Sequence, residues 1–330
     1  MSNVIIRLKD IVKQYGNNLV LDHINLDIFS GEIFGIIGAS GSGKTTLLST
    51  LIGFLKTDSG DVLFKQEHLL DFYDSTEPFR SVFKKQNDVK RIFGFASQDP
   101  SFYSKLTVAE NLDYFGTLYG LSKIDRQTNS KTLINLMGLT SAKDSLAENL
   151  SGGMQKRLDI ACALVHDPKV LILDEPTADL DPFLRKHFWK LIKKINKKGT
   201  TIILASHNLA ELEVLCNRVG ILHQSKVASV GTPDQLKDQY SKDEEIHLET
   251  FPGNYDVIKD SIKHKNITKM ENKGTELVIY TSQAEQVLHE ILHIIEKNKE
   301  SLIDVRLSKP SLDEVFLSLA KKSRNLPEKK

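Results

Sequence analysis

The sequence lacks long hydrophobic runs, has few cysteines and carries almost no net charge, and each shortage excludes a class of protein. No apolar stretch approaches the roughly 18 residues that a membrane-crossing helix needs, so we do not expect a membrane channel. The two cysteines, Cys162 and Cys216, have no CxxC spacing, and no signal peptide is recognisable, which favours a reducing, cytoplasmic setting. A formal net charge of +1 argues against nucleic acid as a partner.

Internal repeats and coiled-coil heptads are absent as well. The composition, with 40% hydrophobic and 26% charged residues, is ordinary for a soluble globular protein. Because 330 residues exceed one typical hydrophobic core, we expect two domains.

The first part of the chain alternates strand-like runs with turns. Apolar runs at 4–8, 19–28 and 33–37 predict strands, and the stretch 16–18 predicts a hairpin turn between the first two. Residues 66–90 are polar and rich in lysine, and we interpret them as an irregular surface excursion.

The middle of the chain has helical periodicity from about 108 to 164, followed by apolar strand runs at 170–173 and 201–204. A helix from about 183 to 197 separates the two strands. Continuous apolar strands that alternate with helices are typical of a parallel sheet that is buried on both faces. The fold class is therefore α/β.

A charged stretch begins near Pro233, and a second pattern follows it. The expected elements are strands at 246–250 and 302–307, a hairpin at 267–280, and helices at 255–263, 284–297 and 312–320. This βαββαβ order predicts a small, ferredoxin-like α+β domain. The predicted limits are a first domain at 1–235 with a helical subdomain at about 99–165, a linker at 236–245, an accessory domain at 246–320 and a basic, disordered tail at 321–330.

The stretch 38–46 is a complete phosphate-binding loop of the form GxxxxGK[ST]. It consists of Gly38, Ala39, Ser40, Gly41, Ser42, Gly43, Lys44, Thr45 and Thr46. An apolar strand precedes it and a helix follows it, which is the context that the motif requires. Backbone N–H groups and the helix N-terminus bind phosphate, Lys44 reaches the β- and γ-phosphates, and the Thr45 hydroxyl holds Mg²⁺.

Two carboxylates, Asp174 and Glu175, end the apolar run 170–173. Ligands bind at strand ends in parallel sheets, so both side chains are expected to face the phosphate loop. Asp174 then holds Mg²⁺ through water, and Glu175 acts as the general base that polarises the attacking water. The alternative is that the pair only caps the following helix.

A second anion site is predicted at Ser151, Gly152 and Gly153, which open a clear helix. The simpler alternative is an N-cap serine followed by a glycine turn. Two anion sites in one chain indicate that one ATP is held between two chains.

In this order, the residues resemble the ATP-binding-cassette (ABC) family over residues 1–235. The stretch 38–46 resembles its Walker A loop, 150–155 its LSGGQ signature, and Asp174 with Glu175 its Walker B pair. The resemblance implies a P-loop NTPase cassette with a mixed sheet core and a helical subdomain.

Three single residues gain a role only through that resemblance. Tyr15 resembles the aromatic residue that stacks on adenine, Gln98 the Q-loop glutamine that senses Mg²⁺ and water, and His207 the switch histidine. Taken alone, Tyr15 is a packing residue, Gln98 a polar loop residue and His207 a polar residue at a helix start. The stretch 178–181 resembles the D-loop.

The sequence departs from the family pattern at three places. Met154 stands where the signature has glutamine, and Asp179 stands where the D-loop commonly has a small residue. The stretch 66–90 resembles an insertion, which puts in doubt only the geometry that leads into the Q-loop.

A zinc-protease motif, HExxH, occurs at 289–293. His289 and His293 could share a metal, with Glu290 as a base. The helical wheel places the apolar residues of 284–295 on the opposite side, so we interpret both histidines as solvated and expect no zinc.

The stretch 309–316, KPSLDEVF, resembles an element of exporter ATPases that pair with a separate permease, and the runs 106–112 and 118–121 point the same way. The resemblance implies an ATP-hydrolysing transporter subunit of the drug, polysaccharide and lipid efflux branch. It implies ATP and Mg²⁺ as cofactors, a head-to-tail homodimer (or a closely related second cassette), a transmembrane permease and a place at the inner face of the membrane. The main alternative is a soluble cassette ATPase without a permease. A chromosome ATPase would need coiled-coil insertions, and a binding module would need a dead site.

Overall fold

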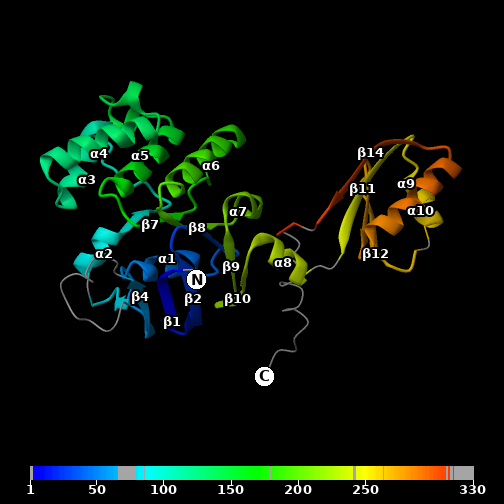
Figure 1. The fold of residues 1–330 in the computed structure, drawn as a ribbon, viewed down its shortest axis with the longest axis horizontal. Coiled ribbons are helices and arrows are strands. Elements are labelled where there is room, and N and C mark those ends of the chain that lie inside the picture. The colour runs from blue at the N-terminus through cyan, green and yellow to red at the C-terminus, as the bar shows by residue number, and fades with distance from the viewer. Residues whose placement is uncertain are drawn as a thin grey trace. The chain divides into compact units, whose positions relative to one another are not determined.

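The computed structural model describes residues 3–65, 79–84, 86–178, 180–240, 243–262, 264–309, 311, 312 and 315. The chain divides into two compact units, Met1–Val230 and Gly231–Lys330 (Figure 1). Each unit has its own hydrophobic core. Among the helices of these described ranges, none has the length and apolarity needed to cross a membrane.

The first unit contains two sheets. The antiparallel sheet has the order β2-β1-β4-β5, and the larger one has the order β10-β9-β3-β8-β7-β6. The strands are β1 (Val4–Tyr15), β2 (Asn18–Phe29), β3 (Ile33–Ile37), β4 (Ser59–Lys65), β5 (Phe79–Ser81), β6 (Phe93–Ala96), β7 (Val170–Asp174), β8 (Thr201–Ser206), β9 (Arg218–His223) and β10 (Lys226–Gly231).

Strands β6, β7, β8, β3 and β9 run parallel, and β3, β7 and β8 are buried along their whole lengths. Only two residues join β9 to β10, which requires an antiparallel pair, so the sheet is mixed as predicted. The register places Ile37 beside Ser206 and Asp174 beside Ala205. The segments that follow β3, β7 and β8 therefore meet at one edge of the sheet.

The helices of the first unit are α1 (Lys44–Leu51), α2 (Gln86–Ile92), α3 (Val108–Leu118), α4 (Lys123–Leu136), α5 (Gly152–Leu164), α6 (Pro182–Asn196) and α7 (Leu209–Leu215), with short 3-10 turns at Thr140–Ala142 and Ala147–Asn149. The green helices α3, α4 and α5 gather in one group (Figure 1). A capping box at Thr107 and Glu110 fixes the start of α3.

The prediction of an irregular excursion at 66–90 is wrong for its described part. Phe79–Ser81 pairs with β4 as strand β5, and α2 begins at Gln86. Val82 and Val89 are buried in the main core. Two valines spaced among lysines give no clear periodicity, so only the tertiary contacts reveal these elements. Residues 66–78 lie outside the described part.

The second unit begins with helix α8 (Pro233–Tyr240), in the stretch where the composition predicts a charged linker. Leu236 is fully buried, so this segment is packed rather than extended. The remaining elements are β11 (Glu244–Phe251), α9 (Tyr255–Ser261), β12 (Ile267–Asn272), β13 (Leu277–Thr281), α10 (Ala284–Lys297) and β14 (Ser301–Ser308).

The sheet order β12-β13-β11-β14, with every pair antiparallel, is that of the predicted ferredoxin-like fold. In α10, Val287 and Ile291 are buried while His289 and His293 are exposed, as the helical wheel predicts. The predicted helix at 312–320 and the tail at 321–330 lie almost wholly outside the described residues.

Candidate functional site

The phosphate loop connects the buried strand β3 to helix α1. Gly43 is the N-cap of α1 and has φ +100°, a region that side chains rarely adopt. A Cβ at Gly38 would lie 2.2 Å from Ser42 Oγ, so this position accepts only glycine without rearrangement. Lys44 Nζ donates to the carbonyls of Gly38 (2.9 Å) and Ala39 (3.3 Å), which closes the loop around the lysine.

Thr45 and Asp174 meet directly, although they come from different motifs. The Thr45 hydroxyl donates to Asp174 Oδ2 at 2.7 Å. Burial raises the pKa of Asp174 above its ordinary value, and the neighbouring Glu175 charge adds to that, while the Thr45 hydrogen bond opposes it. Asp174 Oδ1 and Ser42 Oγ are buried without a hydrogen-bond partner. The Thr45 hydroxyl and the Asp174 carboxylate, whose Oδ1 has no hydrogen-bond partner, are oxygen ligands of the kind that suits a hard cation.

Glu175 and His207 form the second pair of the site. His207 Nδ1 lies 2.8 Å from Glu175 Oε2, and the His207 backbone N–H donates to the same oxygen at 3.3 Å. The other carboxylate oxygen lies 3.7 Å from Lys44 Nζ. The Glu175 side chain is 11% exposed, whereas that of His207 is 64% exposed. The structure thus brings Lys44, Thr45, Asp174, Glu175 and His207 into one cluster.

Tyr15 lies at the end of β1 and is half exposed. Val20 of β2, the strand that pairs with β1, packs against the loop, because a Cβ on Gly43 would lie 2.9 Å from Val20 Cγ1. The Tyr15 ring lies 5.5 Å from Lys13 Nζ, a cation–π distance. A stacking role for Tyr15 on adenine stays a prediction.

Gln98 is exposed and follows β6, and helix α5 holds its backbone. Lys156 Nζ donates to the carbonyls of Ser97 (3.0 Å) and Gln98 (3.3 Å), and Asp159 Oδ1 accepts from the Ser101 N–H at 2.7 Å. Burial raises the Asp159 pKa. No local pattern in the sequence points to Lys156 and Asp159, because their partners lie 58 or 59 residues away.

Ser151 is the N-cap of α5, and its carbonyl accepts from the N–H groups of Met154 and Gln155 at 2.8 Å. Ser151 and Gly152 are exposed. Both 38–46 and 151–153 are fully described, and no hydrogen bond or ion pair joins them.

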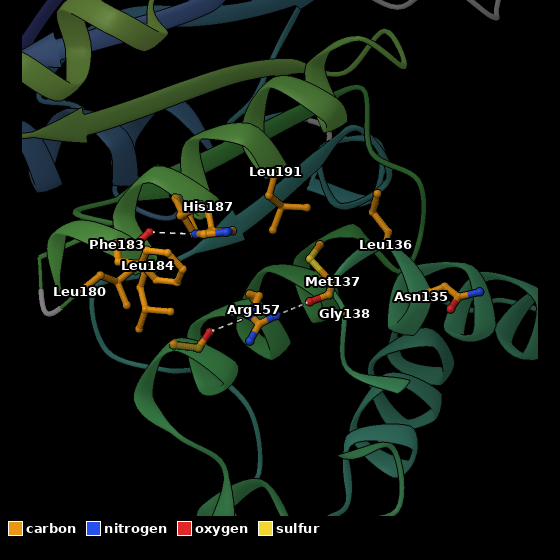
Figure 2. A pocket seen from close by; sticks show the side chains of 12 residues that line it. Asn135, Leu136, Met137, Gly138, Arg157, Leu180, Phe183, Leu184, His187 and Leu191 are labelled. Atoms are coloured by element: carbon orange, nitrogen blue, oxygen red, sulfur yellow. Dashed lines mark hydrogen bonds between the residues drawn. The ribbon is translucent and has the colours of Figure 1, made fainter. Parts of the chain in front are cut away.

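A groove of about 390 Å³ separates α5 from α6 (Figure 2). Arg157 crosses one wall: Nε donates to the Gly153 carbonyl at 3.1 Å and one terminal nitrogen to the Met137 carbonyl at 2.8 Å. These bonds tie the N-terminus of α5 to the end of α4. A Cβ on Gly153 would lie 3.1 Å from Leu184 of α6, so the signature segment also lies close to the helix that follows the D-loop. Asp181 caps that helix, and Asp179 lies outside the described residues.

This chain is similar to known ATP-binding proteins in sequence and in fold. The ABC transporter family matches residues 21–178, and the family of DrrA1-3-like ATP-binding protein C-terminal domains matches residues 231–320. The linearmycin resistance ATP-binding protein LnrL of Bacillus subtilis (strain 168) is 30% identical over 316 residues, which cover 95% of this chain and 97% of LnrL. This chain belongs to the ABC transporter ATP-binding proteins.

Other ABC proteins are similarly related. The Nod factor export ATP-binding protein I of Rhizobium sp. (strain N33) is 31% identical over 97% of this chain and 98% of its own length. The probable multidrug ABC transporter ATP-binding protein YbhF of Escherichia coli (strain K12) is 33% identical, but the match covers only 39% of it. Among solved structures, cbiO1 from Clostridium perfringens, part of the ABC transporter complex cbiONQ, has a TM-score of 0.63 and 29% identity over 72% of this chain and 92% of that one.

The family assignment confirms the predicted fold class and the predicted relation to ABC exporters. ABC ATP-binding domains bind ATP and are ATPases, and they act with a membrane permease as dimers. The roles of the single site residues stay predictions.

Proposed function

We propose that this chain is the ATP-hydrolysing subunit that powers export through a separate membrane permease, at the inner face of the cell membrane. The cluster of Lys44, Thr45, Asp174, Glu175 and His207 carries the proposal, because it joins a phosphate-binding lysine to a carboxylate suited to activate water. Relatives named for drug resistance and for Nod factor export favour export over the permease-free alternative.

In this proposal Glu175 is the general base, and His207 orients it through the 2.8 Å contact. Thr45, Asp174 and Gln98 would together hold Mg²⁺. Asp174 Oδ1, which is buried without a hydrogen-bond partner, fits that assignment. Mg²⁺ supplies neutralisation of phosphate charge when bound. The N–H groups of 38–46 hold the phosphates, and Tyr15 stacks on adenine.

The exposed Ser151 and Gly152 are proposed to complete the site of a second copy, because no hydrogen bond or ion pair joins them to the phosphate loop of their own chain. A mixing experiment tests this head-to-tail dimer. Lys44→Ala and Ser151→Arg homodimers should each be inactive, whereas their mixture forms heterodimers with one intact site. We expect the mixture to recover part of the wild-type ATPase rate. An inactive mixture, with heterodimer formation shown by two affinity tags, would contradict the head-to-tail arrangement.

The permease is proposed to dock at an apolar hollow of about 320 Å³. It is lined by Ile52, Gly53, Phe54, Val89, Lys90, Phe93, Phe95 and Tyr119. Phe54 is 86% exposed, and Phe93 and Phe95 belong to the strand that leads directly to Gln98. A cytoplasmic helix seated there would be coupled to the Gln98 segment.

The function is tested by purifying the tagged chain from membranes of its own cells. We expect a multispanning membrane protein to co-purify and to raise the ATPase rate in reconstituted vesicles. Phe54→Glu should abolish this association and leave ATP binding intact. Ile124→Glu is the matched control, since Ile124 is also highly exposed (76%) but lies in α4. Equal loss from both variants, or a wild-type chain with no membrane partner, would count against the proposal.

A further inference from the structure

Glu211 is a fully buried carboxylate in helix α7, and three side chains from three different segments donate to it. Its Oε2 accepts from the hydroxyls of Thr177 (2.6 Å) and Ser206 (3.1 Å). Its Oε1 accepts from the indole Nε1 of Trp189 in α6 at 2.8 Å. All three donors are uncharged, so the contact is a set of directed hydrogen bonds rather than an ion pair.

Two of these donors lie next to Glu175 and His207 in the sequence, the two residues to which the proposed function gives a catalytic role. Thr177 lies two residues after Glu175, and Ser206 immediately precedes His207. One oxygen atom of Glu211 therefore holds both segments at once. Ser206 Oγ also accepts from the Asn208 N–H at 3.0 Å. This bond links the residue before His207 to the residue after it.

The backbone of Glu175 needs such a restraint. Its φ of +46° lies in the left-handed region, which a residue with a long side chain rarely adopts. A conformation of this kind persists only where the surrounding structure fixes it. The Glu175 N–H donates to Ala205 of β8 at 2.9 Å, and the Thr177–Glu211 bond fixes the chain two residues further on.

We propose that Glu211 is a positioning residue for ATP hydrolysis, which holds Glu175 and His207 in register through Thr177 and Ser206. It touches neither nucleotide nor metal in this role. The inference rests on the proposed functions of Glu175 and His207. It predicts that loss of the carboxylate slows hydrolysis without weakening ATP binding.

The first test is Glu211→Gln, which keeps the size of the side chain. Its NH₂ group must face either the indole N–H or the two hydroxyls, so it cannot accept from all three donors. Because misplacement of a reacting group by about 1 Å costs on the order of 100-fold, we expect kcat to fall about 10- to 100-fold. The KM and the Kd for ATP should stay within about threefold of wild type.

A matched pair at Thr177 separates positioning from folding. Thr177→Val keeps the shape but removes the donor, and Thr177→Ser keeps the donor but removes a methyl group. We expect Thr177→Val to lower kcat and Thr177→Ser to restore most of it. In a double-mutant cycle, Thr177→Val should cost little more once Glu211→Gln is present.

Trp189→Phe is the control. It removes a donor to Glu211 but leaves the hydrogen bonds of Glu211 to Thr177 and Ser206 in place. It should lower the melting temperature but leave kcat within about threefold of wild type, since Oε2 keeps both hydroxyls. Trp189 is the single tryptophan of the chain, so its emission reports in the other variants whether the cluster stays folded.

The inference is overturned if Trp189→Phe lowers kcat as much as Glu211→Gln, or if Thr177→Ser and Thr177→Val behave alike. A Glu211→Gln protein with the wild-type kcat would overturn it too. A wild-type chain that binds ATP but never hydrolyses it would instead contradict the proposed function itself.

Discussion

The Thr45 hydroxyl donates a 2.7 Å hydrogen bond to Asp174 Oδ2, although 129 residues separate the two in the sequence. The bond links the start of helix α1 to the end of strand β7. It holds a hydroxyl and a carboxylate beside each other at the edge of the sheet.

Replacement of Asp174 by Asn should stabilise the ligand-free protein. Burial raises the Asp174 pKa in the folded state above its usual 3.8. The folded state then binds the proton more tightly than the unfolded state, so stability falls as pH rises from the ordinary value through the raised one. At pH 7 we expect Asp174→Asn to raise the melting temperature, by about 2–4 °C for each 1 kcal/mol of the penalty that is removed.

The same variant should lose its response to Mg²⁺. Thermal melts with ATP are compared in the presence of Mg²⁺ and of EDTA. Wild type should gain more stability with Mg²⁺, while Asp174→Asn should show about the same melting temperature in both. An undiminished Mg²⁺ effect would show that Asp174 does not hold the metal.

Glu175→Gln should bind ATP normally and hydrolyse it at least about 100-fold more slowly, the usual contribution of a general base. ATP binding is followed by a fluorescent analogue and hydrolysis by phosphate release. Glu148→Gln, which changes a surface glutamate paired with Lys105, is the control and should keep full activity. Normal turnover by Glu175→Gln would refute the assignment of the base.

His207→Ala should lower kcat and leave the Kd for ATP unchanged, because His207 contacts Glu175 and not the phosphate loop. The His207 backbone N–H still donates to Glu175 at 3.3 Å, so we expect a smaller loss than for Glu175→Gln, on the order of 10- to 100-fold. Single-turnover hydrolysis measures it. A variant as inactive as Glu175→Gln would assign His207 a larger role.

His166 should make the first unit sensitive to acid. Burial lowers its pKa from 6.5 to about 4, so the unfolded state binds the proton more readily between these values. The contribution of neutral His166 to the free energy of unfolding is complete above about pH 6.5. It is lost as the pH drops toward 4, by about 3 kcal/mol in total. Urea unfolding followed by the emission of Trp189 measures this slope in the first unit.

His166→Phe should flatten that pH dependence. A phenyl ring can keep the stacking on Tyr119, whose ring lies 3.7 Å away, but it cannot titrate. The exposed His289 of the second unit provides the control variant, His289→Gln, which should keep the wild-type slope. An unchanged slope in His166→Phe would place the acid sensitivity elsewhere.

Asp159→Ala should loosen the segment that contains Gln98, since Asp159 Oδ1 holds the Ser101 N–H at 2.7 Å. Hydrogen exchange of the Ser101 amide should become at least about tenfold faster, the effect of losing a bond of about 1.4 kcal/mol. Asp144→Ala, at a side chain that is 81% exposed, is the control. Equal exchange in both variants would show that Asp159 does not restrain this segment.

The sequence alone was sufficient to predict the strands and helices whose apolar residues recur with a strong periodicity. Strand β3 and helix α10 have the predicted limits, and the alternation of apolar strands with helices correctly predicted a sheet buried on both faces. Strand β5 and helices α2 and α8 were missed, because each is short and polar and is fixed by one or two buried apolar residues, such as Val82 and Leu236.

For the site, the sequence determined the ligand class and the order of the motifs, because a phosphate loop is a local pattern of glycines, lysine and threonine. Only the tertiary structure decided what holds these motifs in place. The hydrogen bonds of Glu211 join residues far apart along the chain. So do the hydrogen bonds of Lys156 and Asp159 to the backbone of the Gln98 segment. Such contacts depend on strand order and register, which pack distant segments together and leave no periodic trace in the sequence.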